Sequence, residues 1–389
     1  MGENRKIKGL FLSLDHQISQ EALQSQGFKG NGIEKKIVNQ YHCLEDYGFE
    51  MEMYCPFAKR PHKLHAIGRR FPLYWIFSYG KSVLERADIF DFVYVRRPWF
   101  IDGNTIFFLR RMKKRNPALK IIIEYPTYPG GTEANKLNMY PLVWKDRIWS
   151  RFIKTVADRV MTFSKDDIID NVKTICTCNA INPELVRPIK REAANSDGKI
   201  HLIACSSMAF WHGYDRMMEG IRQYKKEHNE CPLVLHLVGE GEKLNDYKDF
   251  IRKYDLGNDI ITHGFLCGKQ LDDVYERADI ALDSLGRHRS EIYYNSSLKG
   301  KEYCAKGLPI ISGVETELDT AEDFKYYLRV PADDSTIPVD LIKDFYKSVY
   351  ERGKSRREVI KEISKYAIEH FSFKVSLKPV ADYINGITK

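Results

Sequence analysis

Short apolar segments alternate with helical patterns along almost the whole chain, and this alternation limits the fold more than any other feature of the sequence. Buried strands are predicted at residues 7–14, 49–54, 92–95, 120–124, 199–205, 233–238, 260–265 and 279–285. Several of the segments between them carry apolar residues three and four positions apart, as one face of a helix does. Strands joined by helices form parallel sheets, so the sequence predicts an α/β fold.

The length of 389 residues indicates two domains, because one hydrophobic core rarely serves so long a chain. The alternation of strands and helices stops at residues 188–198, which are polar and unpatterned, and it restarts at Lys199. We therefore predict a first Rossmann-like domain over residues 1–190 and a second over residues 199–370.

Bulk properties exclude several classes of protein. The net charge of +8, from 61 basic and 53 acidic residues, is too diffuse to indicate a nucleic-acid-binding protein. The sequence has no run of about 18 apolar residues that would form a membrane span. The first six residues lead directly into a strand rather than into the apolar core of a signal peptide. A cytoplasmic protein is the resulting expectation.

The eight cysteines are scattered, and several of them lie in or beside apolar segments, as buried thiols do. The pair Cys176 and Cys178 has one residue between its members, which is not the spacing of a zinc site. No metal site is predicted.

The segment 296–311 predicts a short capped helix followed by a buried strand. Ser296 and Ser297 offer N-cap oxygens, and Gly307 and Pro309 stand where the helix must end. Near its N-terminus this helix carries Lys299 and, three residues later, Glu302 on the same face. Phosphate suits the lysine and the free N–H groups, whereas sugar hydroxyls suit the carboxylate, so a nucleotide satisfies both. A surface helix with an internal ion pair is the alternative.

This segment also resembles a known family. Lys299-x-x-Glu302-Tyr303 followed by Ala305-x-Gly307-x-Pro309 is similar to the donor-nucleotide segment of GT-B glycosyltransferases, specifically glycosyltransferase family 4. The resemblance implies two Rossmann-like domains that face an inter-domain cleft, with residues 373–389 forming a helix that crosses back to the first domain. It also implies a retaining, metal-independent transfer of a hexosyl group from a nucleotide-sugar, UDP rather than GDP, with no cofactor.

The resemblance extends to the other loops that follow predicted strands. Two arginines, Arg287 and Arg289, precede the helix N-terminus, and guanidinium groups bind phosphate with two hydrogen bonds. The residues predicted for the donor site are Gly30, Gly32, Ser207, His212, Gly213, Phe265, Arg287, Arg289, Ser297, Leu298, Lys299 and Glu302. Two positions depart from the family pattern. His212 stands where the family usually has a basic residue, and Tyr294 stands where many members have a first glutamate. A plain turn at the glycine loop and a solvated basic loop at 287–289 are the alternatives.

The acceptor side is less clearly defined. Residues 125–133 follow the predicted strand 120–124, at the end of a strand where α/β sheets bind ligands. The histidine that family members often carry in this region is absent. Glu124, Tyr128 and Glu133 are the remaining catalytic candidates, and a rigid proline-bounded loop without a catalytic role is the alternative.

Residues 140–156 alternate aromatic with basic side chains, a pattern that suits the surface of a membrane bearing lipid-linked acceptors. The predicted function is therefore transfer of a sugar to a glycan or lipid-linked acceptor in bacterial surface polysaccharide biosynthesis, at the inner face of the membrane. Two alternatives stay open: a GT-B sugar-nucleotide epimerase, and a catalytically silent nucleotide-binding protein.

Overall fold

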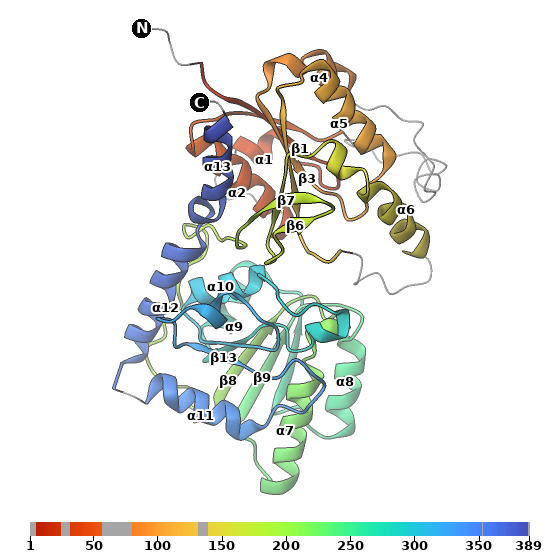
Figure 1. The fold of residues 1–389 in the computed structure, drawn as a ribbon. Helices are drawn as coiled ribbons and strands as arrows, with labels where there is room; N and C mark the ends of the chain where they lie inside the picture. Colours follow the sequence, from red (N-terminus) through yellow and green to blue (C-terminus); the bar gives the residue numbers. More distant parts are fainter. Residues whose placement is uncertain (1–4, 25–31, 57–79, 131–138, 352, 388–389) are drawn as a thin grey trace. The chain divides into compact units, whose positions relative to one another are not determined.

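The computed structural model describes residues 5–24, 32–56, 80–130, 139–351 and 353–387. The chain forms two compact units (Figure 1). Unit 1 comprises Met1–Cys178 and Phe373–Lys389, and unit 2 comprises Asn179–Ser372.

Unit 1 is built on a seven-stranded sheet in the order β2-β1-β3-β4-β5-β7-β6. Its strands are β1 (Lys8–Ser13), β2 (Glu50–Tyr54), β3 (Phe92–Arg96), β4 (Lys120–Tyr125), β5 (Arg159–Thr162), β6 (Ile168–Ile169) and β7 (Val172–Cys176). All pairs are parallel except the antiparallel pair of β6 with β7. Its helices are α1 (Gln20–Gln24), α2 (Gly32–Asp46), α4 (Lys81–Glu85), α5 (Gly103–Arg115), α6 (Tyr140–Ser150) and α13 (Phe373–Ile387).

Unit 2 is built on six parallel strands in the order β10-β9-β8-β11-β12-β13. They are β8 (Ile200–Cys205), β9 (Leu233–Val238), β10 (Ile260–Gly264), β11 (Ile280–Leu282), β12 (Ile310–Ser312) and β13 (Tyr327–Arg329). The helices are α7 (Asp215–His228), α8 (Leu244–Lys253), α9 (Gly268–Tyr275), α10 (Leu298–Lys306), α11 (Val339–Tyr350) and α12 (Arg356–Phe371). Helix α12 packs against α10, and α11 packs against α7.

The order of the strands determines where each sheet can bind a ligand. In unit 1 the chain continues from β1 to β2 on one side and later to β3 on the other. In unit 2, β8 has β9 on one side and β11 on the other. The order therefore reverses between β1 and β3 and between β8 and β11. In open α/β sheets, ligands bind at the carboxyl ends of the strands on either side of such a reversal.

The polar segment 188–198, predicted to separate the domains, lies within unit 2. The chain is already bound to unit 2 before this segment, because Asn179 N–H donates to Ser296 Oγ over 2.7 Å. The N–H groups of Lys190 and Arg191 then donate to Glu276 over 3.0 Å. These contacts place the division between Cys178 and Asn179, earlier than the predicted limit of residue 190.

The terminal helix α13 belongs to unit 1 and packs beside α2 (Figure 1). Thr177 Oγ1 donates to the carbonyl of Ser376 over 2.6 Å, and the Tyr47 hydroxyl donates to the carbonyl of Lys374 over 2.5 Å. Pro379 lies inside this helix. Because α13 is itself buried at Leu377, Val380, Ala381 and Ile384, it completes the hydrophobic packing of unit 1.

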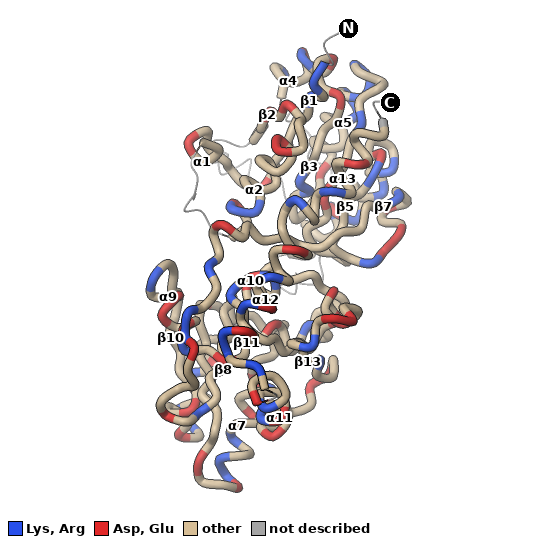
Figure 2. Tube along the Cα trace, turned by 90° about the vertical axis from the view of Figure 1, so that its left-hand side faces the viewer, with Lys and Arg blue, Asp and Glu red and all other residues tan. Residues whose placement is uncertain are grey.

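Basic and acidic residues occur together in the described part of both units. Figure 2 shows Lys and Arg interspersed with Asp and Glu over both units. Among the described residues, no helix combines the length and the apolar character that a membrane span requires.

Candidate functional site

The loops that follow β8 and β11 contact each other through their backbones. Gly213 adopts φ +64°, and a Cβ there would lie 2.5 Å from the backbone nitrogen of Gly286. Leu285 N–H donates to the carbonyl of His212 over 2.7 Å. Glycine at 213 is therefore required both by its φ angle and by this close approach. The contact fixes the two loops at the strand-order reversal of unit 2.

Lys299, in the first turn of α10, lies at the centre of a polar cluster beside these loops. Its Nζ lies 2.9 Å from both His212 Nδ1 and Ser284 Oγ. It lies 3.2 Å from the Tyr214 hydroxyl and 3.4 Å from Asp283 Oδ1. These groups come from the loop after β8, from the loop after β11 and from α10, so the cluster joins three segments of unit 2.

The N-terminus of α10 is capped as the sequence predicts. Ser297 Oγ accepts the N–H of Gly300 over 3.0 Å and donates to Asp283 Oδ2 over 2.6 Å. The helix ends at Gly307, which adopts the left-handed conformation with φ +81°. Asp283 therefore holds both the N-cap serine and the lysine of the same helix, and it orients the N-terminus of α10 toward the cluster.

The contacts of His212 define its protonation state. An ammonium group only donates hydrogen bonds, so Nδ1 of His212 must accept from Lys299 and the ring proton lies on Nε2. Burial, together with the charges of Lys299 and Arg287, holds the pKa of His212 well below its ordinary value. His212 is neutral at physiological pH and has one N–H, on Nε2, with which to donate.

The cluster carries an excess of positive charge. Burial lowers the pKa of Lys299 to about 8, while Asp283 acts to raise it and Arg287 to lower it. Lys299 is thus still largely protonated at neutral pH. Arg287 is buried on the short 3-10 helix Arg287–Ser290 and lies close enough to influence both Lys299 and His212. Two cations and one carboxylate leave a net charge that favours an anionic ligand.

Glu302 lies one turn further along α10 and is half-buried. The hydroxyl of Tyr275 donates to its Oε1 over 3.3 Å. Its charge raises the pKa of Cys205 at the end of β8, and the charge of Lys299 lowers that same pKa, although burial has the largest effect. Both side chains therefore face the carboxyl end of β8, as their spacing of three residues predicts.

The remaining donor candidates occupy different surroundings. Ser207 is exposed in the loop after β8, and Phe265 is 71% exposed in the loop after β10. Leu298 is the first residue of α10. Gly32 is the first residue of α2, and no described heavy atom lies within 4 Å of the position its Cβ would take. Gly30 lies outside the described residues.

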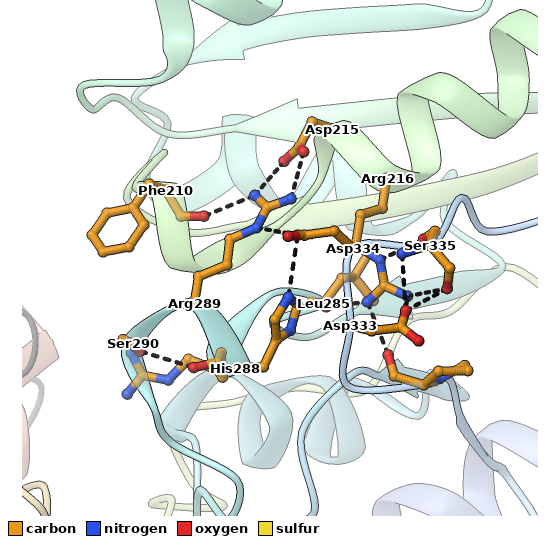
Figure 3. Close-up of polar contacts among 12 residues, drawn as sticks. Phe210, Asp215, Arg216, Leu285, His288, Arg289, Ser290, Asp333, Asp334 and Ser335 are labelled. Atoms are coloured by element: carbon orange, nitrogen blue, oxygen red, sulfur yellow. Dashed lines mark hydrogen bonds and ion pairs between the residues drawn. The ribbon is translucent and has the colours of Figure 1, made fainter.

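The structure argues against Arg289 as a phosphate clamp (Figure 3). Its NH1 and NH2 bind the two oxygens of Asp215 over 2.8 Å and 2.7 Å, and its Nε binds Asp334 over 2.7 Å. NH1 also donates to the carbonyl of Phe210. The hydrogen bond with Asp215 has the largest effect in raising the pKa of Arg289. With its donors committed to protein oxygens, Arg289 links α7 to the 331–337 loop.

Glu124, a catalytic candidate from the sequence, is a structural carboxylate instead. It is fully buried, and its Oε1 binds Lys36 Nζ over 3.1 Å and Arg96 NH1 over 2.6 Å. Its Oε2 accepts from Tyr94 over 2.7 Å and from Gln40 over 2.9 Å. Burial alone would raise the pKa of Glu124, but the two cations and the hydrogen bonds lower it to about 2. A carboxylate with both oxygens occupied and so low a pKa is a poor proton acceptor.

The other acceptor-side candidates give less information. Tyr128 is half-buried, with its ring centroid 6.1 Å from that of Tyr125, and burial raises its pKa. Glu133 lies outside the described residues. A histidine missed by the sequence analysis, His16, follows β1 near the strand-order reversal of unit 1. Burial and the charge of Arg96 lower the pKa of His16, so its imidazole is neutral and able to accept a proton.

Sequence reasoning also missed four residues that organise the unit 2 site: Asp283, Ser284, Tyr214 and Tyr275. Asp283 and Ser284 directly follow β11, and polar residues at the end of a buried strand were the signal available. The two tyrosines do not directly follow a predicted strand, and nothing in their local sequence indicates that both are buried. Within the described part of the chain, no three His, Cys, Asp or Glu side chains are arranged to hold a metal ion.

Two Rossmann-like units with parallel sheets define the class of this protein: it has the GT-B fold, as predicted. Residues 186–291 match the family model described as glycosyl transferases group 1. Among solved structures, a glycosyltransferase from Rickettsia africae is similar with a TM-score of 0.61 and 13% identity, over 99% of each chain. The sucrose-phosphate synthase of Thermosynechococcus elongatus is similar with a TM-score of 0.62 and 13% identity, over 98% of this chain and 100% of its own chain.

HepE of Anabaena in complex with UDP gives a TM-score of 0.57 at 13% identity, over 98% of this chain and 100% of its own. No curated protein matches the sequence. At such identities the structural comparisons establish the fold. The group 1 match begins seven residues into unit 2 and extends just past the 3-10 helix that carries Arg287 and Arg289. The resemblance to family 4 in particular stays a prediction.

Proposed function

We propose that this protein is a glycosyltransferase that binds a nucleotide-sugar donor in unit 2. The observation that carries the proposal is the cluster around Lys299, where a capped helix N-terminus, two cations and a neutral histidine meet at the strand-order reversal. The group 1 match over residues 186–291 supports the same reading, because it includes the loop after β8 and the first part of the loop after β11, up to the residue before Ile292.

In the proposed donor complex the diphosphate lies at the N-terminus of α10, near Lys299, His212 and Arg287. Backbone N–H groups of the first turn and these side chains would stabilise the charge that develops on the departing nucleoside diphosphate. The ribose hydroxyls bind the carboxylate of Glu302. UDP as the nucleotide is supported by the fold shared with HepE, whose structures hold UDP or UDP-glucose.

We further propose a retaining, metal-independent transfer of a hexosyl group to a glycan or a lipid-linked acceptor in the synthesis of a bacterial surface polysaccharide. The resemblance to family 4 supports this finer reading. Glu133 and Tyr128 remain acceptor-side candidates in the proposal, whereas Glu124 is removed from the catalytic set by its buried ion pairs.

The direct experiment is to incubate the protein with UDP-sugars and GDP-sugars, with and without short glycan acceptors, and to measure released nucleotide. Release of UDP that increases with acceptor supports the proposal. Isomerisation of the sugar without release would identify an epimerase instead. Binding of nucleotide with neither reaction would identify a silent nucleotide-binding protein.

Replacing Glu302 with alanine is expected to weaken UDP binding about tenfold or more, because a carboxylate that accepts ribose hydroxyls contributes about 1.5–3 kcal/mol. Titration calorimetry measures this change. Glu227→Ala removes an exposed carboxylate of α7 and serves as the control, with unchanged affinity expected. Equal affinity of Glu302→Ala and the unsubstituted protein would refute the ribose contact.

We also propose a cytoplasmic location at the inner face of the membrane, and a surface of unit 1 supports the membrane contact. Tyr140 and Trp144 on α6 are 64% and 60% exposed, and Phe152, two residues after the end of this helix, is also exposed. The exposed basic residues there are Arg147, Arg151 and Lys154. The acidic residue of this helix, Asp146, is bound by Arg97 over 2.7 Å and 2.8 Å. Exposed aromatic rings with exposed positive charges suit an anionic membrane surface.

The double substitution Trp144→Ala with Arg151→Ala is expected to lower binding to mixed phosphatidylglycerol–phosphatidylcholine vesicles about tenfold, since one basic residue near such a surface contributes about 1 kcal/mol. Co-sedimentation measures the bound fraction. Tyr254→Ala, which truncates a partly exposed aromatic residue at the end of α8, is the control. Equal binding of the double variant, or equal binding to pure phosphatidylcholine, would contradict the proposed contact.

A further inference from the structure

Three histidines form a continuous hydrogen-bonded row across neighbouring strands of unit 2, apart from the Lys299 cluster. His201 on β8 lies with its Nδ1 2.8 Å from Nε2 of His236 on β9. His236 Nδ1 lies 3.0 Å from Nε2 of His263 on β10. The rings stack with centroids 5.1 Å and 5.2 Å apart. We call this row the histidine ladder.

The ladder begins at a surface carboxylate and runs through the interior. Asp197 Oδ2 lies 3.0 Å from His201 Nε2, and the Asp197 side chain is 47% exposed. His201 and His236 are buried, whereas His263 at the edge strand is half-buried. Two charged groups near the row affect the pKa values of its rings: Arg277 lowers those of His236 and His263, and Asp197 raises that of His236. Asp279 accepts the backbone N–H of His201 and is itself paired with Arg191 and Arg356.

The position of every ring proton follows from the carboxylate. Hydrogen bonds from Lys199 N–H and His201 outweigh burial and lower the pKa of Asp197, which is therefore ionised and can only accept. His201 must then carry its proton on Nε2 and accept at Nδ1 from Nε2–H of His236, which in turn accepts from Nε2–H of His263. All hydrogen bonds of the ladder point toward Asp197. The two nitrogens of His236 face different neighbours, so the three rings do not converge on one metal ion.

The rings of His236 and His263 are held neutral. Burial, with smaller effects from His201, His263 and Arg277, lowers the pKa of His236 to about 3. Burial and Arg277 also lower the pKa of His263. A charge in the middle of the ladder is thus unfavourable, whereas at its end the ring of His201 lies 3.0 Å from the carboxylate of Asp197.

We propose that the histidine ladder is a proton relay that reverses its hydrogen-bond direction on taking up one proton. The proton binds Nδ1 of His263, the Nε2 proton of His263 passes to Nδ1 of His236, and the Nε2 proton of His236 passes to Nδ1 of His201. After these transfers His201 carries a proton on both ring nitrogens, so the charge of the proton taken from solvent lies on His201, paired with the carboxylate of Asp197. Nδ1 of His263 changes from an acceptor to a donor.

This reversal occurs beside loops of the candidate donor site. Gly264 follows His263, and its carbonyl accepts the N–H of Gly239 over 2.7 Å. The glycine turn after β9 continues to Glu240, whose carbonyl accepts the N–H of Met208 over 2.8 Å. The turns after β10, β9 and β8 are therefore hydrogen-bonded in series. Resting on the proposed function, the three histidines are positioning residues for the loops that carry Phe265 and Ser207.

The relay is tested by ¹⁵N NMR of the imidazole rings in the full chain. At neutral pH all three ladder histidines are expected to be Nε2–H tautomers, and on acidification His236 and His263 are expected to change to Nδ1–H with the same midpoint. Asp197→Asn, a surface substitution that preserves the packed rings, is expected to lower that midpoint by about one pH unit. Separate midpoints, Nδ1–H tautomers at neutral pH, or an unchanged midpoint in Asp197→Asn would overturn the proposal.

A second measurement tests the positioning role. The affinity for UDP is expected to vary with pH around the ladder midpoint, and His263→Gln is expected to abolish this dependence while preserving binding at neutral pH. His42→Gln, which removes an exposed histidine of α2, is the control and is expected to keep the dependence. An unaltered pH dependence in His263→Gln would refute the positioning role. Absence of UDP binding at every pH would count against the proposed function, and the tautomer measurement would still decide the relay.

Discussion

Replacing Glu124 with glutamine is expected to reduce the free energy of unfolding of unit 1 by about 3–5 kcal/mol, the range found when one partner of a buried ion pair is removed. The carboxylate is the shared partner of Lys36 and Arg96, and the three side chains are almost completely buried. Glutamine preserves the volume but leaves two buried cations without a counter-charge. Urea unfolding followed by circular dichroism measures the loss.

The loss of stability should occur only when the substituted carboxylate belongs to a buried ion pair. Glu52→Gln removes a carboxylate paired with Arg86 at the surface, and exposed pairs contribute about 0.2–1 kcal/mol, so this control should change stability little. A loss as small as that of Glu52→Gln would show that the Glu124 network does not stabilise the unit.

The ion pairs of Glu124 also predict how the free energy of unfolding changes with pH. The pKa of Glu124 falls from an ordinary value of 4.5 to about 2 on folding. A group with a depressed pKa stabilises the fold fully above its unfolded value, and this stabilisation is lost as the pH falls from about 4.5 toward 2. Glu124→Gln should therefore flatten the acid limb of the stability profile over that window.

Much of the fold could be predicted from the sequence because local rules decide it. Apolar runs predicted most strands of both sheets, although not the short β6, β7 and β13. Ser297 and Gly307 predicted the ends of α10 through capping and backbone conformation. These features depend on residues a few positions apart. The α/β class follows from strands that alternate with helices, and the GT-B class was implied by the family resemblance of residues 299–309.

The partners of buried charges could not be predicted in this way. Glu124 stands at the carboxyl end of a predicted strand, where ligand-binding residues often lie, but its partner Lys36 lies 88 residues earlier, and nothing local indicates the pairing. Arg289 resembled a phosphate clamp until its carboxylates were found, Asp215 74 residues away and Asp334 45 residues away. The row that His201 forms with His236 and His263 depends on the order of β8, β9 and β10 in the sheet, which no local pattern indicates.

Replacing Lys299 with methionine is expected to weaken UDP binding about 10- to 100-fold, because hydrogen bonds to charged groups contribute about 1.5–3 kcal/mol. Methionine keeps an unbranched side chain but removes the charge and the donors that reach His212, Ser284 and Asp283. In the unsubstituted protein, affinity should also fall as the pH rises past about 8, where Lys299 loses its proton. Titration calorimetry across pH measures both effects.

A loss of affinity must be separated from a loss of structure, because Lys299→Met leaves Asp283 buried without its cation. Adding Asp283→Asn removes that unpaired charge, so the double variant should recover thermal stability relative to Lys299→Met yet still bind UDP weakly. Lys253→Met, at the end of α8, is the matched control with unchanged affinity. Full affinity in the stable double variant would show that the positive charge of Lys299 does not attract the diphosphate, and the donor site would then have to depend on Arg287 and the N–H groups of α10.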